Sequence, residues 1–239
     1  MKILFIGNSF SSDLVRYMQD ISNGELFVRN LYIGGCSLET HNKNIDSGEE
    51  AYEYVDAGVT LGKISIPDAL AADEWDVISV QQVSSHSGIP ESYEPYITNL
   101  LSYVKERCPK ARLVFHKTWA YESNSDHPGF AAYGNSTERM HNAICDTVKA
   151  VTAKHGLDVI PSGDAVAAAR KMPEFDFENG GQPITRDGFH MNIPYGRYLI
   201  GAVAYKFFTG RSAKDVTYVP EDADEALIKK LRALADTII

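Results

Sequence analysis

The sequence predicts an α/β fold in which a parallel sheet of five strands lies between helices, within one domain of residues 1–239. Short apolar runs alternate along the chain with segments of helical period, which is typical of β-α-β units and a parallel sheet. The runs at residues 2–6 and 76–80 are almost entirely apolar, as expected of strands that helices cover on both faces. No internal repeat or low-complexity linker divides the chain.

Five apolar runs have the composition of strands. The first stops at the turn-like sequence Gly7-Asn8-Ser9, and the second stops at Gly34-Gly35. The expected strands are residues 2–6, 26–33, 76–81, 112–116 and 157–160.

Most of the intervening segments have the period of a helix. In residues 11–22, for example, Leu14, Met18 and Ile21 are spaced i, i+4, i+7 and therefore share one face. The expected helices are residues 11–22, 93–107, 138–155, 163–171, 194–208 and 222–238. Two polar stretches, residues 40–62 and 122–137, show neither pattern, and we expect irregular surface loops there that shape the functional site.

The charge balance excludes several kinds of partner. Lys and Arg total 23 against 32 Asp and Glu, which gives a net charge of −9. Such a chain lacks the positive surface of a nucleic-acid binder or of a protein that adheres to anionic membranes, so we expect neither partner.

The location of the protein is expected to be cytoplasmic, or secreted if a leader has been removed. Residues 3–6 are too short a run for a secretory signal, and no run approaches the ~20 apolar residues of a membrane span. The three cysteines, Cys36, Cys108 and Cys145, lie far apart without a CxxC, which suits a reducing compartment.

The chemistry is expected just after the strands, because ligands of an open parallel sheet bind beyond the carboxyl ends of its strands. Five clusters qualify, and they contain a hydroxyl, paired glycines, side-chain amides and an acid–imidazole pair. That set of groups is what acyl transfer requires. The clusters are residues 7–11, 34–37, 81–86, 116–119 and 185–190.

Ser9 is the candidate nucleophile, since it occupies a tight strand-to-helix turn beside the free N–H groups of a helix N-terminus. The alternative is that Ser9 or Ser11 only caps the helix, which is a common role of serine. Asp187 and His190 are three residues apart in a turn containing Gly188. This spacing lets the carboxylate accept the Nδ1–H of His190 and leaves the other ring nitrogen free to act as a general base.

Backbone and amide donors for an oxyanion are also present. Ser9 and Gly35 would offer backbone N–H groups, and Gln82 or Gln81 would offer a side-chain amide, although one of two adjacent strand residues must face away. A simple turn at Gly35 and hydrogen bonding along the sheet edge at the glutamines are the alternatives. Asn8, Gln81 and Trp119 are candidates for the substrate pocket, with core packing the alternative for Trp119.

No cofactor is expected. His116, His127 and His141 show no HExxH and no carboxylate–histidine pairing at ligand spacing, so we predict no metal site. GxGxxG and GxxxxGK[ST] are both absent, so no motif supports nucleotide binding.

Taken in order, these clusters resemble the SGNH/GDSL hydrolase superfamily, and in particular an uncharacterised bacterial branch of it. The resemblance rests on Gly7-Asn8-Ser9-Phe10-Ser11, with Asn8 where the family has aspartate, on Gly34-Gly35, and on Asp187-Gly188-Phe189-His190 as the family's Asp-x-x-His. It extends from residue 3 to about residue 208. The family's Gly-x-Asn-Asp block is missing, and alignment places Ser85-His86 where Asn-Asp would stand.

The resemblance implies a flavodoxin-like three-layer α/β/α sandwich and a metal-independent serine esterase. The triad would be Ser9, His190 and Asp187, with an oxyanion hole of Ser9, Gly35 and a third donor, which is Gln81, Gln82 or Ser85. Small acyl esters, above all O-acetyl groups of carbohydrates, are the expected substrates. A non-catalytic carbohydrate-binding relative, or a thioesterase or transacylase with the same triad, are the alternatives.

Overall fold

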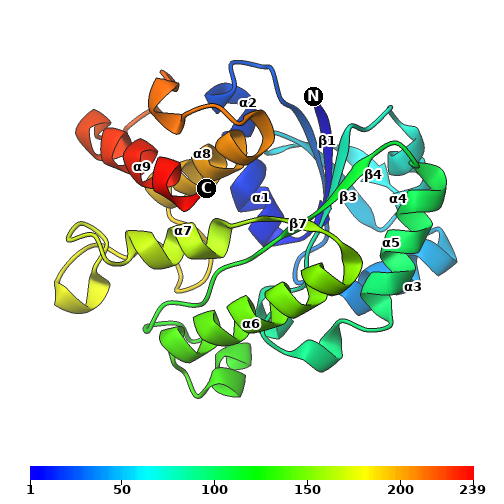
Figure 1. Ribbon diagram of the computed structural model, residues 1–239, viewed down its shortest axis with the longest axis horizontal. Helices are drawn as coiled ribbons and strands as arrows, with labels where there is room; N and C mark the ends of the chain where they lie inside the picture. The colour runs from blue at the N-terminus through cyan, green and yellow to red at the C-terminus, as the bar shows by residue number, and fades with distance from the viewer.

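One mixed sheet of seven strands forms the centre of the computed structural model, which describes residues 1–239 (Figure 1). The order across the sheet is β4-β3-β2-β1-β5-β6-β7, and the five strands from β2 to β7 run parallel. The predicted five-stranded parallel sheet is therefore confirmed, and two antiparallel strands extend it. The strands are β1 (Lys2–Gly7), β2 (Phe27–Tyr32), β3 (Tyr52–Asp56), β4 (Val59–Ile64), β5 (Val77–Val80), β6 (Arg112–His116) and β7 (Asp158–Ile160).

The extension is a hairpin of β3 and β4, in a stretch for which we expected only an irregular loop. Ala57 and Gly58 join the two strands, and both have positive φ, 46° and 94°. This is the conformation of a type I′ turn, which matches the twist of the flanking strands. β4 lies at the edge of the sheet and is largely exposed, and this includes its apolar residues Val59 and Leu61.

Helices cover both faces of the sheet. α1, α2, α7, α8 and α9 lie together on one side of the sheet in Figure 1, and α3, α4 and α5 lie on the other. α6 is tied to the start of α5 through Glu94, which accepts a hydrogen bond from His155. The helices are α1 (Ser9–Val15), α2 (Met18–Ile21), α3 (Leu38–Ser47), α4 (Ile66–Ala71), α5 (Tyr96–Arg107), α6 (Thr137–His155), α7 (Ser162–Ala169), α8 (Tyr195–Thr209) and α9 (Glu225–Ile238). None of them combines the length and apolar character needed to cross a bilayer.

Helix boundaries follow local capping. Ser136 caps α6 by accepting a hydrogen bond from the N–H of Arg139, and Gly156 ends the helix with a φ of 64°. The predicted helix at residues 11–22 is in fact two helices, since α1 ends at Val15 and α2 begins at Met18. α3 begins at Leu38, directly after the second predicted cluster, because Ser37 accepts a hydrogen bond from the N–H of Thr40 and so caps it. Residues 40–47 are therefore helical, and the irregular loop predicted from residue 40 onward was wrong there.

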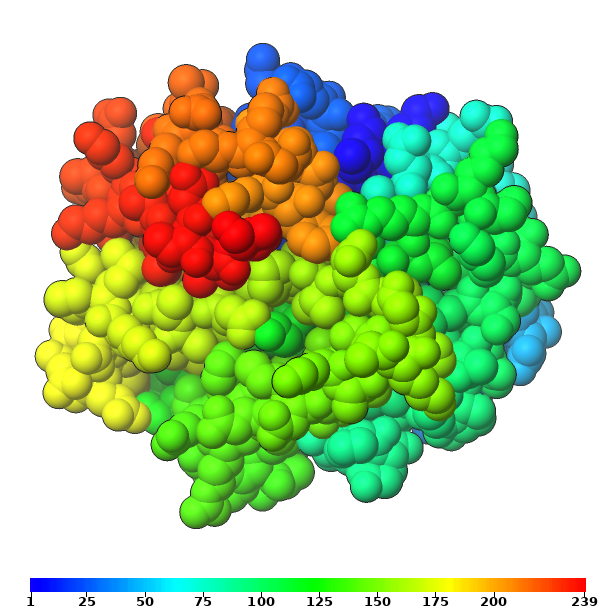
Figure 2. Space-filling model, viewed as in Figure 1, coloured from blue at the N-terminus to red at the C-terminus, as the bar shows by residue number.

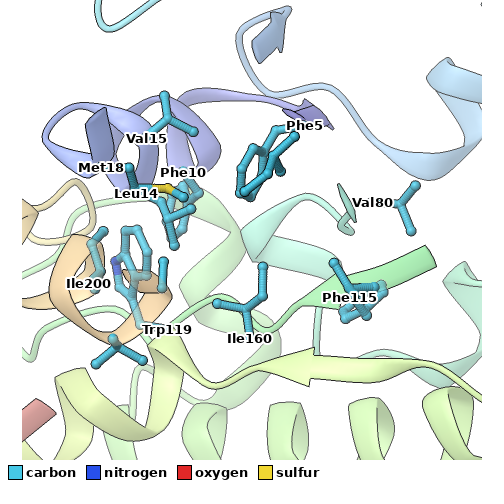
Figure 3. Packing of buried hydrophobic residues seen from close by; sticks show 14 of the residues in the cluster. Phe5, Phe10, Leu14, Val15, Met18, Val80, Phe115, Trp119, Ile160 and Ile200 are labelled. Carbon is cyan, nitrogen blue, oxygen red and sulfur yellow. The ribbon is translucent and has the colours of Figure 1, made fainter. Parts of the chain in front are cut away.

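A continuous apolar core lies between the sheet and the helices on both sides (Figure 3). β1 is its central strand, and Phe5 on this strand packs edge to face on Phe208 of α8. Phe10 of α1 stacks on Trp119 with ring centroids 4.3 Å apart. This second contact joins the first helix to the loop after β6, and both segments reach the carboxyl end of the sheet.

The strand order reverses next to β1, which lies between β2 on one side and β5 on the other. In open α/β sheets, a reversal of this kind creates a crevice at the carboxyl ends of the strands where ligands bind. Hydrogen bonds among Asn8, Cys36, Gln81 and His116 join the segments that follow β1, β2 and β5 to the end of β6, so the topology gathers four of the five predicted clusters at one edge.

Two leucines test the placement of the strands. Leu4 on β1 is fully buried, whereas Leu61 on β4 is 54% exposed. Leu4→Ala should lower the free energy of unfolding by about 2–5 kcal/mol, because it leaves a cavity in the core. Leu61→Ala should change it by no more than about 0.5 kcal/mol. Urea denaturation of both variants measures the difference, and equal losses would contradict the assignment of β4 to the exposed edge.

Candidate functional site

Ser9 lies at the junction of β1 and α1, as the first residue of the helix. Asn8, and not a serine, caps α1, because its Oδ1 accepts a hydrogen bond from the N–H of Phe10 at 3.0 Å. Ser11 is buried and donates to the carbonyl of Asn8 at 2.8 Å. Ser9 is partly exposed and its hydroxyl has no partner within the chain, so it is available to a ligand beside the N–H groups of the helix N-terminus.

Asp187 and His190 form the acid–imidazole pair that their spacing predicted. Asp187 Oδ2 lies 2.6 Å from His190 Nδ1, and Asp187 Oδ1 accepts hydrogen bonds from the backbone N–H groups of His190 and Phe189 at 2.7 and 3.2 Å. The imidazole thus presents Nε2 away from the acid, as a general base requires.

The environment keeps Asp187 ionised. Partial burial acts to raise the pKa of its carboxyl, but the hydrogen bonds from the ring and backbone of His190 and from Phe189 outweigh it, so the pKa lies below the ordinary value. Asp187 therefore remains a hydrogen-bond acceptor for His190 throughout the neutral range.

Aromatic contacts bring the His190 segment to the start of α1. The ring of His190 lies 5.9 Å from that of Phe10, the residue after Ser9. Trp119, which stacks on the same Phe10, donates its indole N–H to the carbonyl of Phe189 at 2.7 Å. Segments that are distant in the sequence thus place the predicted nucleophile and base in one neighbourhood.

The carboxylate of Asp13 anchors the same segment to α1. Asp13 lies one turn after Ser9 and is only 1% exposed. It accepts hydrogen bonds from the backbone N–H of Met191 at 2.9 Å, from Arg197 Nε at 2.7 Å and from Arg186 Nη1 at 3.1 Å. Two guanidinium groups and a backbone donor compensate the buried charge.

Glu122 holds the segment from its other side. Its backbone N–H donates to the carbonyl of Gly188 at 2.8 Å, and its carboxylate accepts hydrogen bonds from the backbone and the hydroxyl of Thr185. Gly188 has a φ of 85°, and a Cβ there would lie 2.6 Å from Cα of Ser125. The turn between Asp187 and His190 therefore requires glycine on two grounds, backbone conformation and space.

Gly35 lies in the turn that follows β2. Its φ is 64°, it is exposed, and the turn is closed by a hydrogen bond from the N–H of Cys36 to the carbonyl of Ile33 at 3.2 Å. Asn8 Nδ2 donates to the carbonyl of Cys36 at 3.0 Å, which fastens this turn to the loop that carries Ser9.

Gln82 is buried, and its amide is engaged by neighbouring groups. Its Nε2 donates to the carbonyl of Ser92 at 2.9 Å and lies 3.1 Å from the Ser92 hydroxyl, while its Oε1 accepts from the N–H groups of Leu38 and Val83. In this arrangement Gln82 joins the start of α3 to the loop after β5, and it has no free amide hydrogen to offer an oxyanion.

Gln81 belongs to a buried chain of neutral hydrogen bonds under the site. Burial lowers the pKa of His116 to about 3, so its imidazole is neutral. Gln81 Nε2 donates to Asn8 Oδ1 at 2.8 Å, and its Oε1 therefore accepts Nδ1–H of His116 at 3.0 Å. His116 Nε2 then accepts from the hydroxyl of Ser162 at 3.1 Å.

The three residues predicted for the substrate pocket lie beneath the site. Asn8, Gln81 and Trp119 are each at most 1% exposed, and their polar atoms bond to the protein itself. They support the surface that a ligand meets, because Asn8 and Gln81 position the loop of Ser9 and Trp119 positions the segment of His190.

Two residues of the site escaped the sequence reasoning. His127 lies against Phe189, with ring centroids 5.0 Å apart. Burial, and to a smaller extent the charge of His190, lowers the pKa of the His127 imidazole. It belongs to the loop predicted to shape the site, but nothing in the sequence singled it out. Asp13 had only a weak signal, namely an acid among the buried positions Phe10 and Leu14 of one helix.

Comparison with known proteins identifies the family of this chain. Residues 2–236 match the family described as domain of unknown function DUF4886. A crystal structure of a DUF4886 family protein from Bacteroides uniformis is 35% identical, with a TM-score of 0.90 over 99% of this chain and 93% of that chain. No curated protein matches the sequence.

Two more distant structures share the fold. A candidate SGNH hydrolase from Slackia heliotrinireducens is 21% identical, with a TM-score of 0.58 over 87% of this chain and 98% of that chain. The acetyl xylan esterase AlAXEase is 13% identical, with a TM-score of 0.56 over 84% of this chain and 96% of that chain. The α/β/α sandwich predicted from the sequence is thus the fold that these structures share.

A matched pair of glycines tests the constraint on the His190 turn. Gly188 and Gly210 both have positive φ, 85° and 70°, but only Gly188 has a backbone neighbour where a Cβ would stand. Gly188→Ala should displace the Asp187–His190 turn and lower the free energy of unfolding more than the roughly 1 kcal/mol expected of Gly210→Ala from backbone conformation alone. Chemical denaturation and the NMR shifts of the His190 ring measure both effects. An unchanged His190 signal in Gly188→Ala would contradict the close contact with Ser125.

Proposed function

We propose that this chain, which belongs to the DUF4886 family, is a serine ester hydrolase related to the SGNH and GDSL hydrolases. The observation that carries the proposal is the Asp187–His190 pair, with 2.6 Å between Oδ2 and Nδ1, held by aromatic contacts next to the helix N-terminus where Ser9 stands. An oriented base and an unpaired hydroxyl at a positive helix terminus are the arrangement of nucleophilic acyl transfer.

In the proposed mechanism, His190 Nε2 takes the proton of Ser9 as its Oγ attacks the ester carbonyl. Asp187 holds the tautomer of His190 and stabilises the imidazolium that forms. The N–H groups of Ser9 and Gly35 stabilise the oxyanion, and His190 returns the proton to the leaving alcohol. Water, activated by His190, then hydrolyses the acyl-enzyme.

Small acyl esters are the proposed substrates, and O-acetyl groups of carbohydrates come first among them. The fold shared with an acetyl xylan esterase supports this order. Thioesters and transfer to an acceptor other than water use the same triad, so a panel of acetylated sugars, longer acyl esters and thioesters separates these activities. Sugar binding without turnover would favour the non-catalytic alternative.

The triad can be tested by labelling and kinetics. A serine-directed organophosphonate should add one label to the wild-type chain and none to Ser9→Ala, while Ser12→Ala, a change in the same helix, should still be labelled. Asp187→Asn should lower kcat by roughly 10⁴-fold, since the base loses its orienting acceptor. Mass spectrometry and p-nitrophenyl acetate hydrolysis provide the readouts. A label on Ser9→Ala would remove Ser9 as the nucleophile.

The role of Gln82 needs a separate experiment. A third oxyanion donor is worth about 2.7–4 kcal/mol, so its loss would cut kcat roughly 100–1000-fold with little change in stability. We infer that Gln82 instead positions Leu38 and Ser92, because its amide already bonds to both. Gln82→Ala should then lower the free energy of unfolding by about 1–3 kcal/mol through the buried N–H of Leu38 and change kcat less than tenfold.

Gln81→Ala and Ser85→Ala complete that experiment, since these residues are the other candidates for the third donor. If one of these substitutions lowers kcat without lowering stability, the residue that it replaces is the third donor. A 100-fold loss of kcat in Gln82→Ala at unchanged stability would show that its amide leaves Ser92 and turns to the substrate.

A further inference from the structure

Three metal-ligating side chains meet between α6 and α7, away from the Ser9–His190 site. His141 and Cys145 are one turn apart on the same face of α6, and Asp164 stands in the first turn of α7. One ligand atom from each lies within 4.8 Å of the others. All three residues are partly buried, and the proposed esterase chemistry uses none of them.

The separations fit a tetrahedral ion. With Zn–S of about 2.3 Å and Zn–N or Zn–O of about 2.0–2.1 Å, a tetrahedral site spaces sulfur from nitrogen or oxygen by about 3.5–3.6 Å. Cys145 Sγ lies 3.6 Å from His141 Nε2 and 3.8 Å from Asp164 Oδ1. The ligand oxygen of Asp164 also lies within 4.8 Å of the ligand nitrogen of His141.

The cluster already attracts a cation. The ammonium group of Lys117 lies 2.5 Å from Asp164 Oδ2 and 3.8 Å from Cys145 Sγ, and its side chain is 12% exposed. It engages one carboxylate oxygen, while the other faces the sulfur. Thiolate and imidazole groups coordinate Zn²⁺ directly, whereas an ammonium group can only donate hydrogen bonds to them.

The site is open to solvent on one side. His141 lines a hollow of about 710 Å³ between the start of α6, the end of α7 and the segment after α7. α6 in green and α7 in yellow-green lie side by side on the face seen in Figure 2. Of the three ligands only His141 lines this hollow, so an ion would reach the cluster past its imidazole and solvent would supply the fourth ligand.

We propose that His141, Cys145 and Asp164 form a Zn²⁺ site that ties α6 to α7, with Lys117 hydrogen bonded to the outer oxygen of Asp164. Binding releases the thiol proton of Cys145 to solvent, and the thiolate then binds the ion. The sequence did not reveal the site, because the carboxylate comes from a different helix and no local ligand motif exists. The site is independent of the proposed esterase activity.

Cobalt provides the test, because Co²⁺ substitutes for Zn²⁺ and a thiolate ligand gives it a charge-transfer absorption in the near ultraviolet. The full chain, stripped with a chelator and kept reduced, should take up one equivalent of Co²⁺ with this absorption, and Zn²⁺ should displace it. Cys145→Ser should abolish the absorption, and His141→Ala and Asp164→Asn should each weaken binding at least tenfold. Cys108→Ser is the matched control, since Cys108 lies outside the cluster and its thiol contacts the carbonyl of Leu70.

A thermal measurement gives a second readout. One equivalent of Zn²⁺ should raise the Tm of the wild type and of Cys108→Ser but not that of Cys145→Ser, because a ligand stabilises only a state that binds it. Lys117→Met should bind Co²⁺ more tightly than the wild type, since a neighbouring positive charge is removed.

Two outcomes would overturn the proposal. The first is a thiolate absorption that survives in Cys145→Ser, which would place the ion elsewhere. The second is the absence of binding by the wild type together with binding by Lys117→Met. The lysine would then be the permanent counter-ion of this cluster.

Discussion

The buried carboxylate of Asp13 joins the first helix to a segment that lies 173 residues later in the chain. Its partners are the guanidinium groups of Arg186 and Arg197 and the backbone N–H of Met191, the residue after His190. A charge in the interior is tolerated only when it is paired and hydrogen bonded, so Asp13 can be buried here only if the later segment brings these partners to it. Because Asp13 and Ser9 share one short helix, the contact also ties the segment of His190 to the helix that carries Ser9.

A second set of contacts supports the site from below without any charge. Asn8 after β1, Gln81 after β5, His116 at the end of β6 and Ser162 after β7 form one hydrogen-bonded chain. Each member comes from the carboxyl end of a different parallel strand, so the chain fixes the spacing of the strand ends. Neutral groups suit this place, because a buried charge there would need a counter-ion next to the N-terminus of α1.

The features that the sequence predicted are those that depend on residues close together in the chain. Apolar runs identified every parallel strand, and the three-residue spacing of Asp187 and His190 was enough to predict their contact. The β3–β4 hairpin was missed although Tyr52 and Val55 before the turn and Val59 and Leu61 after it are apolar, because these few residues lie within a stretch that is otherwise polar and charged. The partners of Asp13 and the direction of the Gln82 amide depend on segments that only the tertiary structure brings near, so the sequence pattern had no bearing on them.

The indole of Trp119 stacks on Phe10 and donates to the carbonyl of Phe189, so it touches both segments of the site at once. The chain has one other tryptophan, Trp75, whose indole N–H donates to the carbonyl of Ala69 in α4. With Trp75 replaced by phenylalanine, the tryptophan fluorescence of the protein would come from Trp119 alone. Its emission would then report any shift of the Asp187–His190 turn against the first helix, without an added dye.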